Sequence, residues 1–175
     1  MNKQKVMVGM SGGIDSSVTA YILQKDGYEV EGVYLKLHDR TDGYHESNLS
    51  YIDGVAKFLG IKYHILDLSK KFKKDVYDYF VNSYIDGNTP NPCVKCNKNI
   101  KFGAMLDFAK EQGASFLATG HYVKTDGKFF YLADDLSKDQ SYFLSQVPKE
   151  AIDFMMFPLS NYKKEDIIKL GANLD

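Results

Sequence analysis

The stretch 9–17, Gly-Met-Ser-Gly-Gly-Ile-Asp-Ser-Ser, holds residue types that could bind phosphate. Gly12 and Gly13 have no Cβ, so consecutive backbone N–H groups can point into one concavity there. A helix that starts directly after the glycines would add the positive end of its dipole. Further hydroxyl donors are supplied by Ser11, Ser16 and Ser17. The stretch therefore predicts a phosphate-binding loop between a strand and a helix.

The same loop lacks the lysine that a Walker A motif uses to reach a terminal phosphate. It therefore does not predict a kinase-type phosphate site. The alternative interpretation is an ordinary glycine-rich turn in which Asp15 and Ser16 only cap the following helix.

A second stretch, 89–97, reads Thr-Pro-Asn-Pro-Cys-Val-Lys-Cys-Asn and contains the only two cysteines of the chain, Cys93 and Cys96. A Cys-x-x-Cys pair is compatible with half a zinc site, a redox pair, or a nucleophile with a neighbour. Zinc needs two further ligands. The histidines show no ligand spacing, so we predict no metal site built from His38, His45, His64 and His121.

The environment of this pair is predicted from its neighbours. Two prolines and Gly87 predict that residues 86–97 form a loop, with the next helix starting near Ile100. That helix start, together with Lys95 and Lys98, would favour a thiolate.

Strand and helix patterns alternate along the first two thirds of the chain. Strands are predicted at 5–10, 29–37, 62–68 and 115–119. Helices are predicted at 15–26, 48–59, 69–84 and 102–112, the third with Phe72, Val76, Tyr79, Phe80 and Val81 facing inward. The polar segment 38–47 is predicted to be a mobile loop at the carboxyl end of a strand. The alternation predicts an α/β, Rossmann-like parallel sheet with helices on both faces.

After Gly120 the pattern changes. Residues 123–133, centred on Asp126-Gly127, predict a β-hairpin, and short helices are predicted at 140–146, 149–154 and 163–170. We therefore expect a catalytic domain over residues 1–145, followed over 146–175 by the start of a helical linker.

Composition and charge are those of a globular chain: 175 residues, 44% hydrophobic, 26% charged and a net charge of −1. The net charge gives no global case for a nucleic-acid partner. Any such binding would depend on two local clusters: Lys70, Lys71, Lys73 and Lys74, which fit a solvated helix face, and Lys95, Lys98 and Lys101 around the cysteines. With no expected signal peptide or membrane-spanning run, we expect a cytoplasmic protein with reduced thiols.

Four segments together resemble one known family. The loop 9–17 is similar to the Ser-Gly-Gly-x-Asp-Ser loop of the ATP pyrophosphatase superfamily, whose adenine nucleotide α-hydrolase-like fold cleaves ATP between the α- and β-phosphates. The order and spacing of four segments resemble those of the tRNA-specific 2-thiouridylase family: 9–17, 89–102, 118–122 and 138–144. This likeness covers nearly the whole chain.

The resemblance implies roles for individual residues. The ATP site would comprise Gly9, Met10, Ser11, Gly12, Gly13, Ile14, Asp15, Ser16, Leu35 and Gly120. The tRNA and its target base would contact Asn91, Pro92, Cys93, His121, Lys138, Asp139 and Gln140. Cys96 would be the catalytic cysteine, assisted by Cys93. Without the family, Leu35 and Gly120 could be plain core and turn positions, and 138–140 could be a solvated helix start.

The implied reaction is ATP-dependent adenylation of the C2 oxygen of the wobble uridine, followed by sulfur transfer from a cysteine persulfide. It implies ATP and Mg²⁺, a persulfide-donor protein, and tRNAs for glutamate, lysine and glutamine. The alternatives are a non-catalytic ATP- and tRNA-binding module, and an ATP-dependent amide-forming synthetase of the same superfamily. The cysteine pair argues against a synthetase, because amide formation needs no thiol there.

Two departures from the family pattern affect the cysteines. The best-known form of the family has an aspartate at the position of Cys93. Our hypothesis is that Cys93 assists Cys96, or that the pair binds an iron–sulfur cluster. The family also uses a second, distant catalytic cysteine, and this sequence has no third one. We therefore expect that cysteine, together with further tRNA-binding domains, to lie beyond residue 175.

Overall fold

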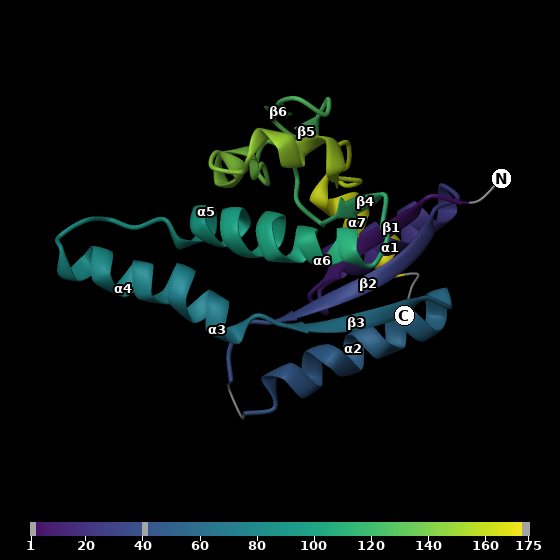
Figure 1. The fold of residues 1–175 in the computed structure, drawn as a ribbon. Coiled ribbons are helices and arrows are strands. Elements are labelled where there is room, and N and C mark those ends of the chain that lie inside the picture. Colours follow the sequence, from purple (N-terminus) through teal and green to yellow (C-terminus); the bar gives the residue numbers. More distant parts are fainter. Residues whose placement is uncertain (1–2, 40–41, 173–175) are drawn as a thin grey trace.

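A five-stranded sheet forms the centre of the molecule in the computed structural model, which describes residues 3–39 and 42–172 (Figure 1). The strands are β1 (Lys5–Met10), β2 (Glu29–Lys36), β3 (Lys62–Asp67), β4 (Phe116–Ala118) and β7 (Met155–Met156). Their order is β3-β2-β1-β4-β7, and every neighbouring pair is parallel. The four predicted strands and the α/β class are confirmed. The fifth strand was not predicted, because two residues are too few to show a strand period.

Successive residues of β1 enter two different cores, as the alternation of a strand requires. Val6, Val8 and Met10 pack against α1 (Ile14–Lys25) and α2 (Tyr44–Leu59). Met7 points to the opposite face, where it packs with Phe102, Met105 and Leu106. Both faces of the sheet are thus covered by helices, which explains why this strand is apolar at nearly every position.

The cysteine pair lies on a helix, so the prediction of a loop over residues 86–97 is wrong for its last part. The segments α5 (Pro92–Cys96), η2 (Asn97–Ala104) and α6 (Met105–Glu111) follow one another without a break. Asn91 is the N-cap, and its Oδ1 accepts the N–H of Val94 at 3.2 Å. Pro92 occupies the first helical position, where its missing N–H costs nothing and its fixed φ suits the helix. The proline that seemed to exclude a helix therefore starts one.

The segment predicted as a mobile loop over 38–47 is helical from Tyr44 onward, so this prediction is also wrong in part. Residues 40 and 41 of this segment lie outside the described residues. Gly43, with a φ of +79°, immediately precedes α2. Its carbonyl accepts the N–H of Ser47 at 2.9 Å. A left-handed glycine thus redirects the chain into a helix that starts one turn earlier than expected.

A continuous helical segment follows β3, made of α3 (Ser69–Phe72), η1 (Lys73–Tyr77) and α4 (Asp78–Ile85). Its last part extends away from the sheet (Figure 1). Val76 is buried as predicted, but Phe80 is exposed, which corrects the expected inward face. The apolar pattern there does not report burial, because the helix continues past the edge of the sheet.

The remaining elements follow β4 along the chain. They are β5 (Lys124–Thr125), β6 (Phe130–Tyr131), η3 (Ser141–Leu144), η4 (Lys149–Phe154) and α7 (Lys164–Gly171). The antiparallel β5–β6 hairpin and the short helices are confirmed. Beyond residue 145 the chain adds β7 to the sheet and packs α7 near α1. The proposed linker role of 146–175 stays a prediction. Among the described helices, none is long and apolar enough to cross a membrane.

Candidate functional site

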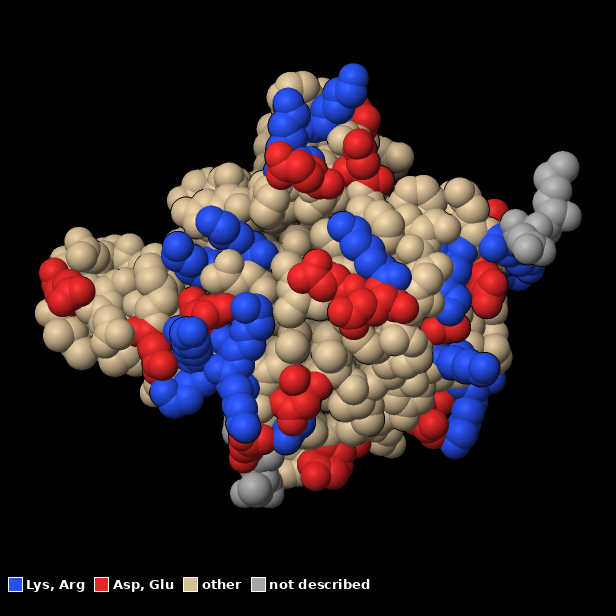
Figure 2. Space-filling model, viewed as in Figure 1, with Lys and Arg blue, Asp and Glu red and all other residues tan. Residues whose placement is uncertain are grey.

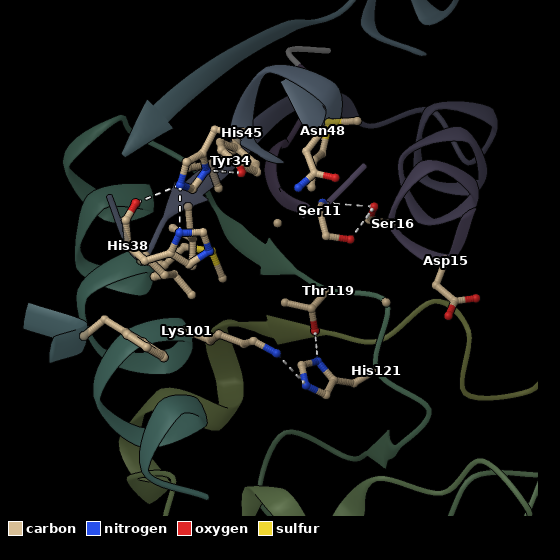
Figure 3. Close-up of a pocket in the computed structure, with 18 of the residues that line it drawn as sticks. Ser11, Asp15, Ser16, Tyr34, His38, His45, Asn48, Lys101, Thr119 and His121 are labelled. Carbon is tan, nitrogen blue, oxygen red and sulfur yellow. Dashed lines mark hydrogen bonds between the residues drawn. The ribbon is translucent and has the colours of Figure 1, made fainter. Parts of the chain in front are cut away.

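A cavity of about 440 Å³ opens at the carboxyl ends of β1, β2 and β4. Chain order reverses between β1 and β4, with β2 and β3 on one side of β1 and β4 on the other. Open parallel sheets bind ligands at such a switch point. The volume suits a small molecule of nucleotide size. Sequence elements far apart in the chain meet around this cavity (Figure 3).

The phosphate loop joins β1 to α1 on one side of this cavity. Gly12 has a φ of +83°, and a Cβ on it would lie 3.2 Å from the backbone oxygen of Asn48. The Ser16 hydroxyl donates to the Gly13 carbonyl at 2.8 Å and accepts the N–H of Ser11 at 3.2 Å. The loop is therefore fixed by its own hydroxyls and by α2 packed against it, and α1 begins directly after Gly13.

Asp15, in the first turn of α1, is held from the C-terminal part of the chain. Its Oδ1 accepts the hydroxyl of Tyr122 at 3.1 Å and the ammonium of Lys164 at 2.6 Å. Burial, and then the neighbouring Asp15 carboxylate, raise the pKa of Tyr122, which keeps its hydroxyl a donor. The negative charge beside the phosphate loop is thereby balanced by Lys164.

Two histidines and a tyrosine form another wall of the cavity. His45 is buried, with Nδ1 lying 2.7 Å from the Tyr34 hydroxyl and Nε2 lying 2.7 Å from the His38 carbonyl oxygen. Because a carbonyl oxygen can only accept, Nε2 of His45 carries a proton. Burial raises the pKa of Tyr34. His38 and His45, from the segment predicted as a mobile loop, therefore contribute a hydrogen-bonded wall.

His121 links the β4 end of the cavity to the cysteine-bearing helix. Its Nδ1 lies 2.8 Å from the Thr119 hydroxyl, and its Nε2 lies 3.4 Å from the ammonium of Lys101 (Figure 3). Burial, and then the charge of Lys101, lower the pKa of His121 to about 3. The imidazole is therefore neutral at physiological pH.

The two cysteines are free thiols three residues apart on α5, which places them on neighbouring positions of one helix face. Cys93 is exposed and Cys96 is partly buried. Burial raises the pKa of Cys96 more than the nearby Lys101 lowers it. The expectation that the surroundings favour a Cys96 thiolate is therefore wrong for the chain by itself. Of the lysines expected to favour it, Lys95 lies over the Tyr79 ring, 5.0 Å from its centroid.

The first lysine cluster lies on α3 and η1, below the cysteine helix in Figure 2. Two of its members are paired with carboxylates of the same helical segment: Lys71 with Asp75 at 2.9 Å and Lys73 with Asp78 at 2.7 Å. These pairs fit the interpretation of this cluster as a solvated helix face.

The predicted site residues fall into two groups. Those that line the cavity are Gly9, Met10, Ser11, Asp15, Ser16, Leu35, Gly120, His121 and Gln140. Outside its lining are Gly12, Gly13, Ile14, Asn91, Pro92, Cys93, Cys96, Lys138 and Asp139. Their functional roles stay predictions.

Residues 138–140 were predicted to contact tRNA, and the side chains of two of them accept hydrogen bonds from backbone N–H groups. Asp139 Oδ1 accepts the N–H of Ala133 at 2.9 Å, and Gln140 Oε1 accepts the N–H of Tyr122 at 3.0 Å. Lys138, in contrast, is exposed. This arrangement leaves Lys138 as the member of the three whose side chain reaches solvent most freely.

Several cavity residues were not predicted from the sequence to belong to the nucleotide site: Tyr34, His38, His45, Asn48, Lys101 and Thr119. Tyr34 and Thr119 lie at or just beyond the carboxyl ends of strands, a position that could have identified them. Asn48 and His45 could not be found this way, because they depend on where α2 packs.

The chain matches one known protein family and curated relatives of known name. The model of the family described as the tRNA methyl transferase HUP domain matches residues 4–175. A curated relative, the tRNA-specific 2-thiouridylase MnmA 1 of Aliarcobacter butzleri, is 78% identical over 175 residues, which is 100% of this chain and 51% of the relative. The chain thus spans about half the length of the curated relatives it matches.

Two solved structures are similar in fold. A 4-thiouridine synthetase–RNA complex with bound ATP matches with a TM-score of 0.66 and 19% identity, over 98% of this chain and 40% of that one. The U34-tRNA thiolase NcsA from Methanococcus maripaludis, with its 4Fe-4S cluster, matches with a TM-score of 0.59 and 22% identity. The match covers 99% of this chain and 56% of the thiolase chain. At these identities the likeness concerns the fold alone.

Proposed function

The chain belongs to the family of the tRNA methyl transferase HUP domain, and from this premise we propose that it is the ATP-binding catalytic part of a tRNA uridine 2-sulfurtransferase. Its similarity to a tRNA-specific 2-thiouridylase over its whole length supports the proposal. The structural observation that carries it is the meeting of Ser11, Ser16, Leu35 and Gly120 around one cavity. These residues come from the loop after β1, from the first turn of α1, from β2 and from the segment after β4.

ATP is the proposed substrate of this cavity. Its phosphates would lie on the loop 9–16, where the start of α1 directs backbone N–H groups outward. Its nucleoside would lie toward Leu35 and Gly120, at the ends of the neighbouring strands. Gly120 lets the segment after β4 pack closely on the start of α1, since a Cβ there would lie 3.1 Å from the backbone of Asp15.

The proposed reaction has two stages. In the first, the C2 oxygen of uracil forms a bond to the α-phosphorus of ATP, and the bond to the bridging oxygen breaks, so that pyrophosphate leaves with the electron pair. In the second, the terminal sulfur of a cysteine persulfide attacks C2, and AMP leaves with the former uracil oxygen. A second thiolate then attacks the remaining S–S bond, which forms a disulfide and leaves sulfur on the base. We assign Cys96 to this second stage, with Cys93 assisting.

Magnesium and an iron–sulfur cluster fit the described residues differently. Mg²⁺ is commonly held by phosphate oxygens with one or two carboxylates, and Asp15 is the carboxylate that lines the cavity. When bound, Mg²⁺ would screen the phosphate charge. Iron–sulfur clusters usually take four cysteine thiolates, whereas this sequence has two cysteines. The two thiols alone do not complete such a ligand set, and we derive no step through a cluster.

The tRNA is proposed to approach from the side of the cysteine helix. Asn91, Pro92 and exposed Cys93 lie at the start of α5 and would face the target base. The base would have to leave its stack to reach the cavity, where it would meet buried His121. Lys138 would contact the RNA backbone, with Asp139 and Gln140 fixing its loop.

The partners and setting of this reaction are also part of the proposal. The substrates would be tRNAs for glutamate, lysine and glutamine, and a persulfide-donor protein would supply the sulfur. We expect the enzyme to act in the cytoplasm, where thiols are kept reduced.

Pyrophosphate release tests the proposal and separates it from its alternatives. The chain is incubated with ATP and unmodified tRNA for glutamate, lysine or glutamine, and pyrophosphate and adenylated tRNA are measured. We expect pyrophosphate release that depends on tRNA and stops when α,β-methylene ATP replaces ATP. Nucleotide binding without any pyrophosphate would favour a binding module, and release that needs ammonia and a carboxylic acid instead of tRNA would favour an amide-forming synthetase.

A further inference from the structure

Lys101 is the one lysine or arginine among the described residues that line the cavity. The phosphate loop itself contains neither residue type, so its donors are backbone N–H groups and hydroxyls. A bound triphosphate carries several negative charges, which are partly balanced by cations in most phosphate sites. Within the described ranges 3–39 and 42–172, Lys101 is therefore the place from which a side-chain cation can act on a ligand of the cavity.

The contacts of Lys101 leave its charge available. Its ammonium can only donate, so the Nε2 atom of His121, at 3.4 Å, must be the acceptor. The proton of the neutral ring then lies on Nδ1, which donates to the Thr119 hydroxyl at 2.8 Å. Among the described residues no carboxylate forms an ion pair with Lys101, and Asp15, which shares the cavity, is paired with Lys164. A neutral ring thus orients the ammonium without cancelling its charge.

Lys101 is also near the Cys96 thiol. It is five residues beyond Cys96 on the same continuous helix, and its charge acts on the Cys96 sulfur. Its side chain enters the cavity from η2, on the face of the sheet opposite to α1. The phosphate loop and Lys101 therefore approach the cavity from two sides, and the ammonium lies on the side from which the base and sulfur would have to arrive.

We propose that Lys101 is a catalytic residue that binds the α-phosphate of the nucleotide, and that Thr119 and His121 position it. The assignment rests on the proposed function, because it takes ATP as the ligand of the cavity. Lys101 keeps its proton and forms no covalent bond. It stabilises the negative charge on the non-bridging oxygens of the α-phosphorus while the bond to pyrophosphate breaks. In this way a helix from the opposite face supplies the cation that the phosphate loop lacks.

Calorimetric titration of the 175-residue chain with ATP and with adenosine tests the contact directly. The variants are Lys101→Met, Lys101→Arg and the matched control Lys98→Met, which removes the same charge from an exposed position of the same helix. We expect Lys101→Met to weaken ATP binding about 10-fold or more, the loss of one charge-assisted hydrogen bond. Adenosine affinity should not change, Lys101→Arg should restore part of the ATP affinity, and Lys98→Met should bind ATP as the parent does.

Equal ATP affinity of Lys101→Met and Lys98→Met would overturn the assignment while leaving ATP as the ligand. Failure of the unaltered chain to bind ATP would overturn both the proposed function and the assignment.

A second measurement needs no change at Lys101. It is ¹⁵N NMR of the imidazole of His121, with the resonances assigned by comparison with the His121→Asn variant. We expect ATP, but not adenosine, to shift Nε2 because the ammonium turns toward phosphate. An identical Nε2 resonance with and without ATP would contradict the proposal.

Discussion

The phosphate loop and the cysteine helix are built in opposite ways. The loop is fixed by hydrogen bonds among Ser11, Gly13 and Ser16, and the middle of the helix behind it is buried, with Thr19 fully inaccessible. The cysteine helix exposes Cys93 in its first turn, and the protruding α4 exposes Tyr84 and Ile85 to 57% and 75%. The comparison indicates that the proposed nucleotide end is fixed by its own hydrogen bonds, whereas the thiol end is exposed, as the proposed approach of tRNA requires. Lys101 lies where the two regions meet.

The largest expected effect separates the two regions by function. In the intact enzyme, Cys96→Ser should abolish thiolation of unmodified tRNA, because no thiol remains at the proposed position for sulfur transfer. The affinity for ATP, measured by calorimetry on the same protein, should be unchanged. Cys93→Ser should reduce thiolation less, since its role is to assist. Full thiolation by Cys96→Ser would contradict the catalytic assignment.

The next prediction concerns the backbone of the phosphate loop. Gly12→Ala places a Cβ at a φ of +83° and 3.2 Å from the Asn48 oxygen. We expect the free energy of unfolding to fall by about 1–3 kcal/mol, and ATP binding to weaken as well. Urea unfolding and calorimetry measure the two effects.

The matched control for this substitution is Gly87→Ala, in the loop before the cysteine helix. Gly87 has a φ of +75°, but a Cβ there meets nothing within 4 Å. Backbone strain alone should cost about 1–2 kcal/mol and leave ATP binding intact. Equal loss of ATP affinity in both variants would mean that the packing of α2 on the loop is not what organises the phosphate site.

A smaller effect is expected in the reactivity of Cys96. Burial raises the pKa of this thiol, so the thiolate fraction at neutral pH is low. In a Cys93→Ser background, alkylation by iodoacetamide should therefore be slow near pH 7 and accelerate as the pH rises through the alkaline range. Because Lys101 lowers the pKa of Cys96, adding Lys101→Met should move the profile to higher pH, whereas Lys98→Met should not. A profile centred below pH 7 would show that the thiol is activated in the isolated chain.

The smallest effect is expected at the ion pair that joins the phosphate loop to α7. Lys164→Met removes the partner of Asp15, but both side chains are partly exposed, so the loss of stability should stay below about 1 kcal/mol. Lys163→Met, its exposed neighbour, serves as the control for the change in net charge. Thermal unfolding measures both, and a loss several times larger for Lys164→Met would show that α7 contributes to the loop far more than one ion pair.

The sequence by itself determined the features that depend on local backbone rules. The glycine loop at 9–17, the strand β1 and the turn at Asp126-Gly127 were all predicted, because each depends on neighbouring residues and their allowed dihedral angles. Locally ambiguous signals failed. Pro92 indicated a loop and instead starts a helix, and the apolar pattern of α4 indicated burial where Phe80 is exposed.

The tertiary structure decided which residues share the cavity. His45 and Lys101 reach it only because α2 and η2 pack on opposite faces of the sheet, and Met155–Met156 becomes a strand only beside β4. These contacts join residues far apart in the chain, so no local pattern specifies them. The protonation state of His121 and the raised pKa of Cys96 follow from the same packing, since burial is the largest cause of both. The sequence predicted a phosphate site and a thiol pair, and the fold alone placed an ammonium between them.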